Sequence, residues 1–361
     1  MKVAIVHDWL TNMGGAEKVI IDLHHLFPNA PIYTSVVNFQ KLDPIFSTMD
    51  IRTTFLQKLP MSKSKYNRYL PLFPLAFESL NLTEYDLILS SSSSIGVKGV
   101  LRDSNSTHIC YCHTPPRYAW DFYQEYLQSV GLVQRSLIRP LMHYLRLYDQ
   151  LSANRVDFFI ANSSIVAKRI NKIYRRDAEI IHPPVDIKAF KNENKAEEDF
   201  YLVVSRLVPY KRIDLAIQAC TKLRKRLIII GDGEERYNLQ NIAGPTIEFL
   251  GYNSNDVIKD YMSRCKAFLF PGYEDFGITP VEAQAAGKPV IGFGKGGILD
   301  SVIHKHTGIL FNEQSVESLI SGIEEFENSY FDFERIVNHS QKFDTEVFRN
   351  KMMEYINKCQ S

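Results

Sequence analysis

Two cations follow one apolar run in the second half of the chain. The segment VVSRLVPYKRIDLAIQAC predicts a strand that ends before Arg206, with Lys211 in the first turn of the next helix. Cations normally favour the other end of a helix, whereas a helix N-terminus attracts anions. The two side chains therefore predict a phosphate site, and a diphosphate is the natural ligand. A pair of solvated surface cations is the alternative.

Two glutamates follow a later apolar run. The segment FLFPGYEDFGITPVEAQAAGKPVIGFG places Glu274 after an expected strand and Glu282 eight residues later, inside the following helix. Thr279, Pro280 and Glu282 fit a T-x-x-E capping box with proline at the first helical position, which explains Glu282 without a ligand. Glu274 has no such explanation, and it follows a parallel strand, where open sheets bind ligands. Gly277 would allow close backbone approach.

The elements that must position these residues alternate along the chain. Short apolar runs separated by amphipathic segments are typical of β-α units that build parallel sheets. Helical patterns around 315–327 and 344–357 come last. Two series of strands are expected, the first near 3–7, 32–36, 87–90, 108–112 and 158–161, the second near 200–204, 226–230, 247–250, 267–270, 290–292 and 308–311.

Length and composition agree with two globular domains. The 361 residues exceed one ordinary hydrophobic core, and 45% hydrophobic with 23% charged residues is typical of globular proteins. Residues 1–175 carry 19 Lys and Arg against 13 Asp and Glu, whereas the rest carries 23 against 28. A basic first half favours an anionic partner such as a membrane surface, with chance as the alternative.

Cysteine spacing and hydropathy indicate a compartment. The five cysteines are dispersed and lack CxxC pairs, so we expect buried reduced thiols. The N-terminal run predicts a first strand rather than a signal peptide, and no apolar run approaches the roughly 18 residues that span a bilayer. We therefore expect a cytoplasmic protein.

Two segments of the first half mix cations with apolar residues. LPMSKSKYNRYLPLFPLAF (59–77) is one, and 135–147, with Arg135, Arg139, His143 and Arg146 opposite leucines, is the other. One reading is a surface for an acceptor or for the inner face of the cytoplasmic membrane. The other is a lid over the core and a solvated helix face. Pro140 either kinks or begins the second segment's helix.

The segment SRLVPYKR followed by EDFGITPVE resembles the donor site of glycosyltransferase family 4, whose members have the GT-B fold of two Rossmann-like domains facing a central cleft. Glu274 and Glu282 match the family's E-x7-E spacing. The resemblance implies that Arg206 and Lys211 bind the diphosphate, Glu274 the donor sugar and Glu282 the ribose. Three backbone amides would approach the sugar and phosphate, those of Phe276, Gly277 and Ile278.

The resemblance extends to the first half. VAIVHDW leads through LTNMGGAEKVI into an expected helix, like the family's glycine loop, so Gly14 and Gly15 would let the backbone approach the donor phosphate. ICYCHTPPRYAWD resembles the active-site loop, which makes His113 the histidine beside the reacting sugar. The domains expected are an acceptor-binding domain at 1–178, a nucleotide-sugar-binding domain at 179–343 and a helix at 344–361 that packs back on the first domain.

The activity that the resemblance implies is retaining hexosyl transfer. VEAQAAGKPVIGFGKGG is similar to mannosyltransferases of bacterial surface-polysaccharide assembly, so GDP-mannose is the expected donor and UDP-sugars are the alternative. The acceptor would be a lipid-linked saccharide or a polysaccharide such as lipopolysaccharide. The sequence lacks a D-x-D motif, so we expect no metal and no cofactor, with Arg206 and Lys211 replacing the metal. No nucleic-acid partner is expected.

Three other functions compete with this one. Gly292, Gly294 and Gly297 fit G-x-G-x-x-G, the pattern of an NAD-dependent oxidoreductase, although the segment after them is short for a crossover helix. A sugar-nucleotide epimerase would use a similar donor cleft, and a non-catalytic sugar-nucleotide sensor would not transfer at all.

Overall fold

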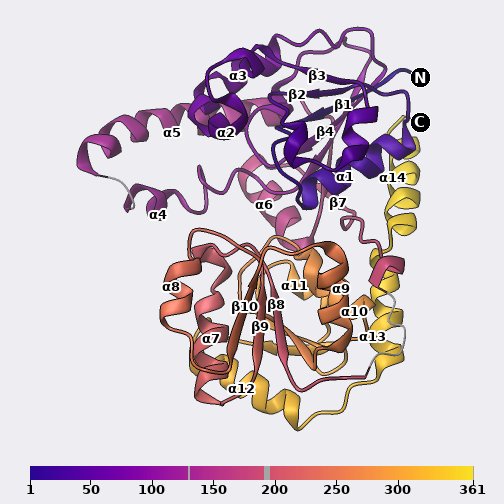
Figure 1. The fold of residues 1–361 in the computed structure, drawn as a ribbon. Helices are drawn as coiled ribbons and strands as arrows, with labels where there is room; N and C mark the ends of the chain where they lie inside the picture. The colour runs from indigo at the N-terminus through magenta and orange to yellow at the C-terminus, as the bar shows by residue number, and fades with distance from the viewer. Residues whose placement is uncertain (129–130, 191–195, 361) are drawn as a thin grey trace. The chain divides into compact units, whose positions relative to one another are not determined.

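The computed structural model describes residues 1–128, 131–190 and 196–360, so residues 191–195 of the expected interdomain connection lie outside the described residues. The described chain contains two parallel sheets, each with helices on both faces (Figure 1). The expected α/β class with two Rossmann-like domains is confirmed.

The chain divides into two compact units. The first consists of Met1–Pro184 together with Phe348–Ser361, and the second is Val185–Val347. The last helix therefore belongs to the same unit as the first strand.

The first unit is built on a seven-stranded sheet in the order β3-β2-β1-β4-β5-β6-β7, and its neighbouring strands pair in parallel. The sequence did not predict β3 and β7, because three-residue edge strands show no clear periodicity. The strands are β1 (Val3–His7), β2 (Ile32–Thr34), β3 (Ile51–Thr53), β4 (Leu87–Ser92), β5 (Thr107–Cys112), β6 (Phe158–Ala161) and β7 (Ala178–Ile180).

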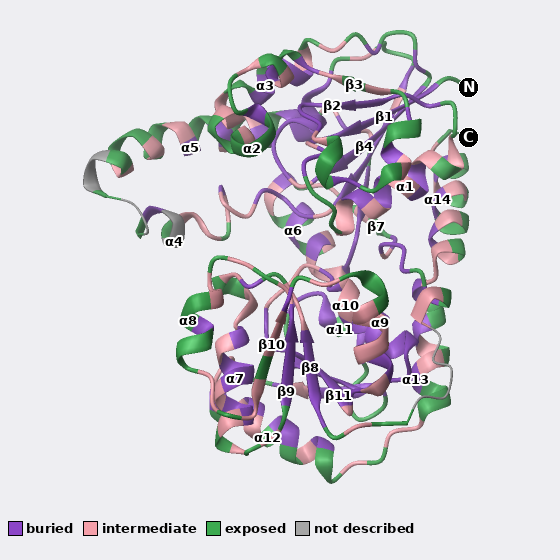
Figure 2. Ribbon diagram, in the orientation of Figure 1, coloured by how far each residue is buried: buried purple, intermediate pink, exposed green. Residues whose placement is uncertain are grey.

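Helices cover both faces of this sheet because its central strands are buried on both sides (Figure 2). One face packs on α1 (Gly15–Leu26) and on α14 (Thr345–Gln360), whose Phe348, Met352 and Ile356 form one buried stripe. The opposite face packs on α3 (Phe73–Glu78), α5 (Leu132–Ala153) and α6 (Ser164–Tyr174). Two short helices complete the unit, α2 (Ser62–Lys65) and α4 (Tyr123–Gln128).

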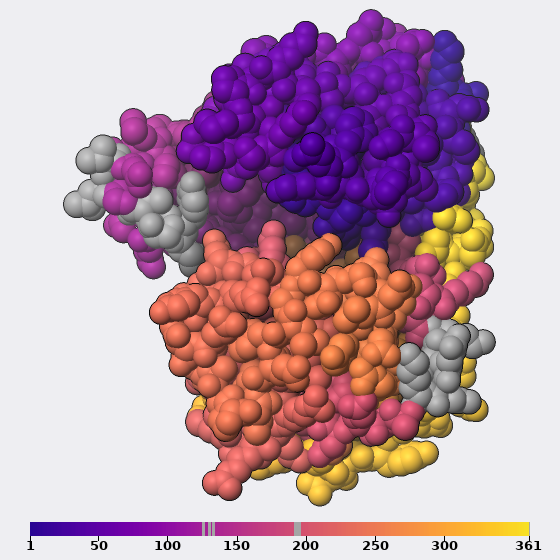
Figure 3. All heavy atoms as spheres, viewed as in Figure 1, coloured from indigo at the N-terminus to yellow at the C-terminus, as the bar shows by residue number. Residues whose placement is uncertain are grey.

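The two segments rich in cations and apolar residues both lie on the α3 and α5 face. Residues 59–77 form several short helical pieces, including the 3₁₀ helix η4 (Tyr66–Leu72). The second segment lies within α5, which runs through Pro140 and projects from the body of the first unit (Figures 1 and 3). Pro140 therefore does not begin this helix.

The second unit is built on a six-stranded parallel sheet in the order β10-β9-β8-β11-β12-β13. All six strands were expected, with ends that differ by no more than one residue, because each is a short and largely apolar run between helices. They are β8 (Tyr201–Val204), β9 (Leu227–Ile230), β10 (Ile247–Gly251), β11 (Ala267–Phe270), β12 (Val290–Phe293) and β13 (Gly308–Phe311).

Helices again cover both faces of the second sheet. One face packs on α7 (Ile213–Lys222), α8 (Arg236–Asn241) and α12 (Val316–Glu327), and the other on α9 (Asn255–Arg264), α10 (Ile278–Ala285) and α11 (Ile298–Ser301). α13 (Phe333–Ser340) was not expected from the sequence.

Four of the five cysteines are buried, as the sequence predicted, and the fifth is half-buried. Cys110, Cys112, Cys220 and Cys265 are buried free thiols, and Cys359 is half-buried and free. Among the helices of the described residues, none combines the length and the apolarity that crossing a bilayer requires.

The packing of α14 predicts that its buried stripe stabilises the first unit. Met352, 1% exposed, lies in the core cluster of this unit, so Met352→Ala should lower the free energy of unfolding by about 2–5 kcal/mol. Glu354→Ala on the exposed side of the same helix is the matched control and should change it by less than about 0.5 kcal/mol. Chemical denaturation measures both, and equal losses would contradict the packing.

Candidate functional site

In the first unit, three polar side chains continue one face of the sheet at its carboxyl edge. The parallel register places His7 opposite Ser91 and Ser91 opposite Tyr111. Side chains alternate along a strand, so His113, two residues after Tyr111, continues the same face. Three strands therefore each supply one polar group just beyond the apolar residues that they bury.

His113 is held on several sides. Its Nε2 lies 2.8 Å from Ser91 Oγ, its backbone N–H donates to the Ser92 carbonyl oxygen at 2.8 Å, and its ring packs against Tyr111 with centroids 5.1 Å apart. Desolvation of the half-buried ring, with a smaller effect of nearby His7, lowers the pKa of His113 to about 3. The imidazole is therefore neutral at pH 7, with one nitrogen protonated and the other an acceptor.

The N-terminus of α1 lies against the same residues. Gly15 begins the helix, and Gly14 before it has extended backbone (φ −160°) that any residue adopts. A Cβ on Gly14 would lie 3.0 Å from Glu17 Oε2, so this glycine leaves room for a carboxylate. The phosphate-approach role expected of Gly14 and Gly15 stays a prediction.

Buried charges hold the loop after β4. Asp8 Oδ2 accepts hydrogen bonds from the backbone N–H groups of Ser93 and Ser94 at 2.7 and 2.8 Å. Burial raises the pKa of Asp8, and nearby Lys98 opposes this. Lys98 is itself fully buried and pairs with Asp149 at 3.0 Å. Lys98 and Asp149 are paired within the fold, and we assign these three buried groups a structural role.

In the second unit, Arg206 and Lys211 follow β8. Arg206 lies in an exposed loop, with one guanidinium nitrogen 3.5 Å from the Tyr210 hydroxyl. The expectation that Lys211 lies in the first turn of the next helix is wrong. Lys211 ends the 3₁₀ turn η7 (Pro209–Lys211), and left-handed backbone at Arg212 (φ 50°) separates this turn from α7.

Lys211 contacts Glu274, which comes shortly after β11. Lys211 Nζ pairs with Glu274 Oε1, and the two side chains are 17% and 20% exposed. β8 and β11 are the adjacent strands at which the strand order reverses. Open α/β sheets bind ligands at this point, outside the carboxyl ends of the strands. The fold therefore brings a cation and a carboxylate together where a ligand is expected.

The helix that carries Glu282 begins before the expected capping box. α10 starts at Ile278, and its N-cap is Gly277, at φ 86°, without a side-chain cap. Thr279 and Pro280 are thus inside the first turn, so the capping box and the placement of proline at the first helical position are wrong. The helix starts earlier than expected because Gly277 has left-handed backbone, a conformation that glycine adopts without strain. Glu282 is 6% exposed, and capping does not explain it.

A glycine turn after β12 supports the loop that carries Glu274. The Gly297 N–H donates to the Glu274 carbonyl oxygen at 2.9 Å, and a Cβ on Gly296 would lie 2.5 Å from that oxygen. A Cβ on Gly297 would lie 2.2 Å from the Asp275 carbonyl oxygen. The glycines therefore permit two loops to pack closely.

Close packing also explains why glycines occupy positions 292, 294 and 297, which fit the G-x-G-x-x-G pattern of dinucleotide sites. A Cβ on Gly292 would lie 2.1 Å from Ile298 Cδ1, and one on Gly294 would lie 3.2 Å from the Phe311 carbonyl oxygen. The helix that follows, α11, has four residues, which is short for the crossover helix of a dinucleotide site.

The structure places the expected residues in two sets, one at the carboxyl edge of each sheet. The first unit holds Gly14, Gly15 and His113, and the second holds Arg206, Lys211, Glu274, Phe276, Gly277, Ile278 and Glu282. Sequence reasoning missed His7, Glu17 and Ser91. The sequence did hold a signal for His7 and Ser91: each lies two residues after a buried apolar residue of its strand, Ile5 or Leu89, and so ends that apolar face with a polar group.

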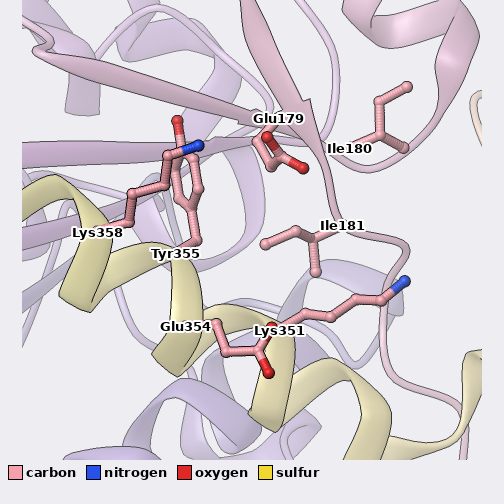
Figure 4. A pocket seen from close by; sticks show the side chains of 7 residues that line it. All are labelled: Glu179, Ile180, Ile181, Lys351, Glu354, Tyr355 and Lys358. Atoms are coloured by element: carbon pink, nitrogen blue, oxygen red, sulfur yellow. The ribbon is translucent and has the colours of Figure 1, made fainter.

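A groove lies elsewhere in the first unit, between edge strand β7 and α14 (Figure 4). It encloses about 270 Å³, and Lys351, Glu354 and Lys358 of α14 line it together with Glu179 of β7. Its acidic and basic side chains balance, and none of the expected site residues lines it. We therefore do not assign the donor to this groove.

The start of α10 leads to a stability prediction. Because Thr279 is not the N-cap, Thr279→Ala should change the free energy of unfolding by less than about 0.5 kcal/mol. Ser315, whose side chain accepts from the Ser318 N–H at the start of α12, is the matched control. Ser315→Ala should cost about 1 kcal/mol. A larger loss of stability for Thr279→Ala than for Ser315→Ala would show that Thr279 caps the helix.

Two protein-family models match the chain in sequence. The model of Glycosyltransferase Family 4 matches residues 13–189, and the model of Glycosyl transferases group 1 matches residues 185–343. HepE of Anabaena, solved in complex with UDP and glucose, has a similar fold: the TM-score is 0.72 at 18% identity, over 99% of each chain.

Curated relatives agree with these matches. A glycosyltransferase of Methanocaldococcus jannaschii is 28% identical over 189 residues, which are 51% of this chain and 53% of that protein. Alpha-1,3/1,6-mannosyltransferase ALG2 of Saccharomyces cerevisiae is 24% identical over 369 residues, with 83% of this chain and 71% of the relative covered. The matches thus span about half of the first relative and 71% of the second. With both family models and the two parallel sheets, they show that the chain belongs to the family 4 type of glycosyltransferases with the GT-B fold.

Proposed function

We propose that this chain is a retaining hexosyltransferase that uses a nucleotide-sugar donor in cell-surface glycan synthesis. The observation that carries the proposal is the Lys211–Glu274 pair at the strand-order reversal of the second sheet. A cation and a carboxylate held side by side suit a ligand that carries both phosphates and sugar hydroxyls. Arg206, at the same edge, supplies a second cation.

The donor site follows from these positions. Arg206 and Lys211 bind the diphosphate and stabilise the charge that develops on it as it leaves, without a metal ion and without a proton from a side chain. Glu274 binds the sugar hydroxyls, and Glu282 binds the ribose. The backbone amides of Phe276, Gly277 and Ile278 approach the sugar and phosphate.

The transferred sugar is mannose and the donor GDP-mannose. Support comes from the yeast relative, which is named a mannosyltransferase, and from the segment 281–297. UDP-sugars are the alternative, because HepE was solved with UDP and glucose.

In the first unit, the backbone at Gly14 and Gly15 approaches the donor phosphate, and His113 lies beside the reacting sugar. The acceptor hydroxyl attacks from the face that the diphosphate leaves, through an oxocarbenium-like state, and its proton passes to an oxygen of the leaving diphosphate, so the anomeric configuration is retained. The acceptor is a lipid-linked saccharide or a polysaccharide.

The enzyme works at the inner face of the cytoplasmic membrane, and a surface of the first unit supports this. Residues 55–77 and 132–148 contain seven Lys and Arg and no Asp or Glu, and both segments pack on one core cluster. Along α5, Leu137, Tyr144, Leu147 and Leu151 are 46–71% exposed. Basic and apolar side chains together suit an anionic lipid surface, which attracts the cations and takes up the apolar groups.

Removal of either cation tests the donor site. Arg206→Ala or Lys211→Ala should weaken nucleoside diphosphate binding about tenfold or more and leave nucleoside binding little changed, because each removes a charged hydrogen bond to phosphate. Isothermal titration calorimetry in EDTA measures both ligands.

The matched control is Lys222→Ala, which removes a surface cation of the same unit, 56% exposed and paired with Glu317, and should change neither affinity. Equal losses for nucleoside and nucleoside diphosphate would remove Arg206 and Lys211 from the phosphate site. Loss of transfer in EDTA, restored by manganese or magnesium, would contradict a metal-independent reaction.

The lipid surface is tested by flotation with vesicles. The chain should bind vesicles that contain anionic phosphatidylglycerol and bind less as salt rises, because salt screens the cations. Leu137→Ser with Leu151→Ser should reduce binding, whereas Tyr252→Ser with Tyr330→Ser, at apolar positions 86% and 89% exposed in the second unit, should not. Equal binding of the two double variants, or dimerisation through α5 instead of vesicle binding, would contradict the proposal.

A further inference from the structure

Four side chains of the first unit form a polar chain of two hydrogen bonds and one longer charged contact, which ends at His113. Ser91 Oγ lies 2.8 Å from His113 Nε2 and 3.1 Å from His7 Nδ1. The other ring nitrogen of His7, Nε2, lies 3.7 Å from Glu17 Oε1. His7 is 2% exposed and Ser91 is fully buried, so water does not compete for the two inner contacts.

Glu17 is positioned as a carboxylate at the far end of this chain. It is the third residue of α1, where the free N–H groups of a helix N-terminus favour a negative charge. Its other oxygen, Oε2, lies over Gly14, where a Cβ would come within 3.0 Å of it. A larger residue at position 14 would therefore press on the carboxylate.

A carboxylate determines the direction of every hydrogen bond in such a chain. At 3.7 Å the Glu17–His7 contact is longer than a hydrogen bond, but the negative charge still favours an N–H over a lone pair on the nitrogen that faces it. With its one proton on Nε2, His7 accepts through Nδ1 from the Ser91 hydroxyl. The oxygen of Ser91 then accepts from His113 Nε2–H.

Without the carboxylate, the two hydrogen bonds could equally run the other way, from His7 Nδ1–H to the Ser91 oxygen and from the Ser91 hydroxyl to His113 Nε2. A serine hydroxyl donates or accepts equally well, so nothing in the two histidines or in Ser91 alone selects one direction. His113 is neutral at pH 7 because its pKa is lowered, and it therefore has one proton to place.

We infer that Glu17, acting through His7 and Ser91, holds the proton of His113 on Nε2 and leaves Nδ1 as a hydrogen-bond acceptor. Among the described residues, no hydrogen bond to His113 Nδ1 is formed, and the residue is partly exposed. Glu17, His7 and Ser91 are thus positioning residues. The next step rests on the proposed function: His113 Nδ1 accepts a hydrogen bond from a hydroxyl of the reacting sugars.

The direct test is the tautomer of His113, read from the two ring nitrogens by long-range ¹H–¹⁵N NMR at pH 7. The chain has 10 histidines, so His7→Gln and His113→Gln identify the two signals. Both His7 and His113 should be neutral with the proton on Nε2. A proton on Nδ1 of His113, or a doubly protonated His7, would overturn the inference.

Variants test whether the carboxylate is the cause. Glu17→Leu should leave His113 as a mixture of tautomers, and Glu84→Leu, which removes an exposed glutamate paired with Lys2, is the control that should leave it unchanged. Ser91→Ala should leave His113 as a mixture of tautomers while His7 keeps its proton on Nε2. Ser91→Thr, which keeps the hydroxyl, should restore the Nε2 tautomer of His113. An unchanged His113 spectrum in Glu17→Leu would refute the role of Glu17.

Transfer rates separate this inference from the proposed function. Glu17→Leu should lower kcat about tenfold, the effect of about one lost hydrogen bond, with donor KM little changed. A changed tautomer with wild-type kcat would confirm the chain and remove His113 from the reaction. A lower kcat with an unchanged tautomer would overturn the inference and leave the proposed function standing.

Discussion

Parallel pairing of β1 with β4 and of β8 with β11 is the constraint on which every candidate residue depends. Parallel strands end at one edge of a sheet, so side chains far apart in the chain meet there. His7 and Ser91 are 84 positions apart, and Lys211 and Glu274 are 63 apart. A shift of one residue in either register would turn alternate side chains to the opposite face and separate these groups.

The two edges carry different electrostatics. In the second unit the set is ionic and partly exposed: Lys211 and Glu274 compensate each other and are available to a charged ligand. In the first unit the inner groups are buried, and His7 and the Ser91 hydroxyl carry the contact to His113. The ionic set of the second unit suits phosphate recognition. The buried set of the first unit suits control of which His113 nitrogen carries the proton.

Regular elements were predictable where the chain was buried on both faces. Strands such as β11 are uninterrupted apolar runs, and their ends place Arg206, Glu274 and His113 at the edge of a sheet without further information. At the candidate donor site, two errors came from single backbone conformations. Left-handed Arg212 removed Lys211 from α7, and left-handed Gly277 moved the start of α10 ahead of Thr279. Helix periodicity does not report such residues.

The sequence by itself determined the class of fold, the donor-site motif and the type of residue at each sheet edge, because these follow from local periodicity and from spacing along the chain. Only the tertiary structure decided which of those residues touch. Contact of Glu17 with His7, and of Ser91 with both histidines, depends on the strand register and on where α1 packs. Those are long-range properties of the packed core, and no segment of the sequence contains them alone.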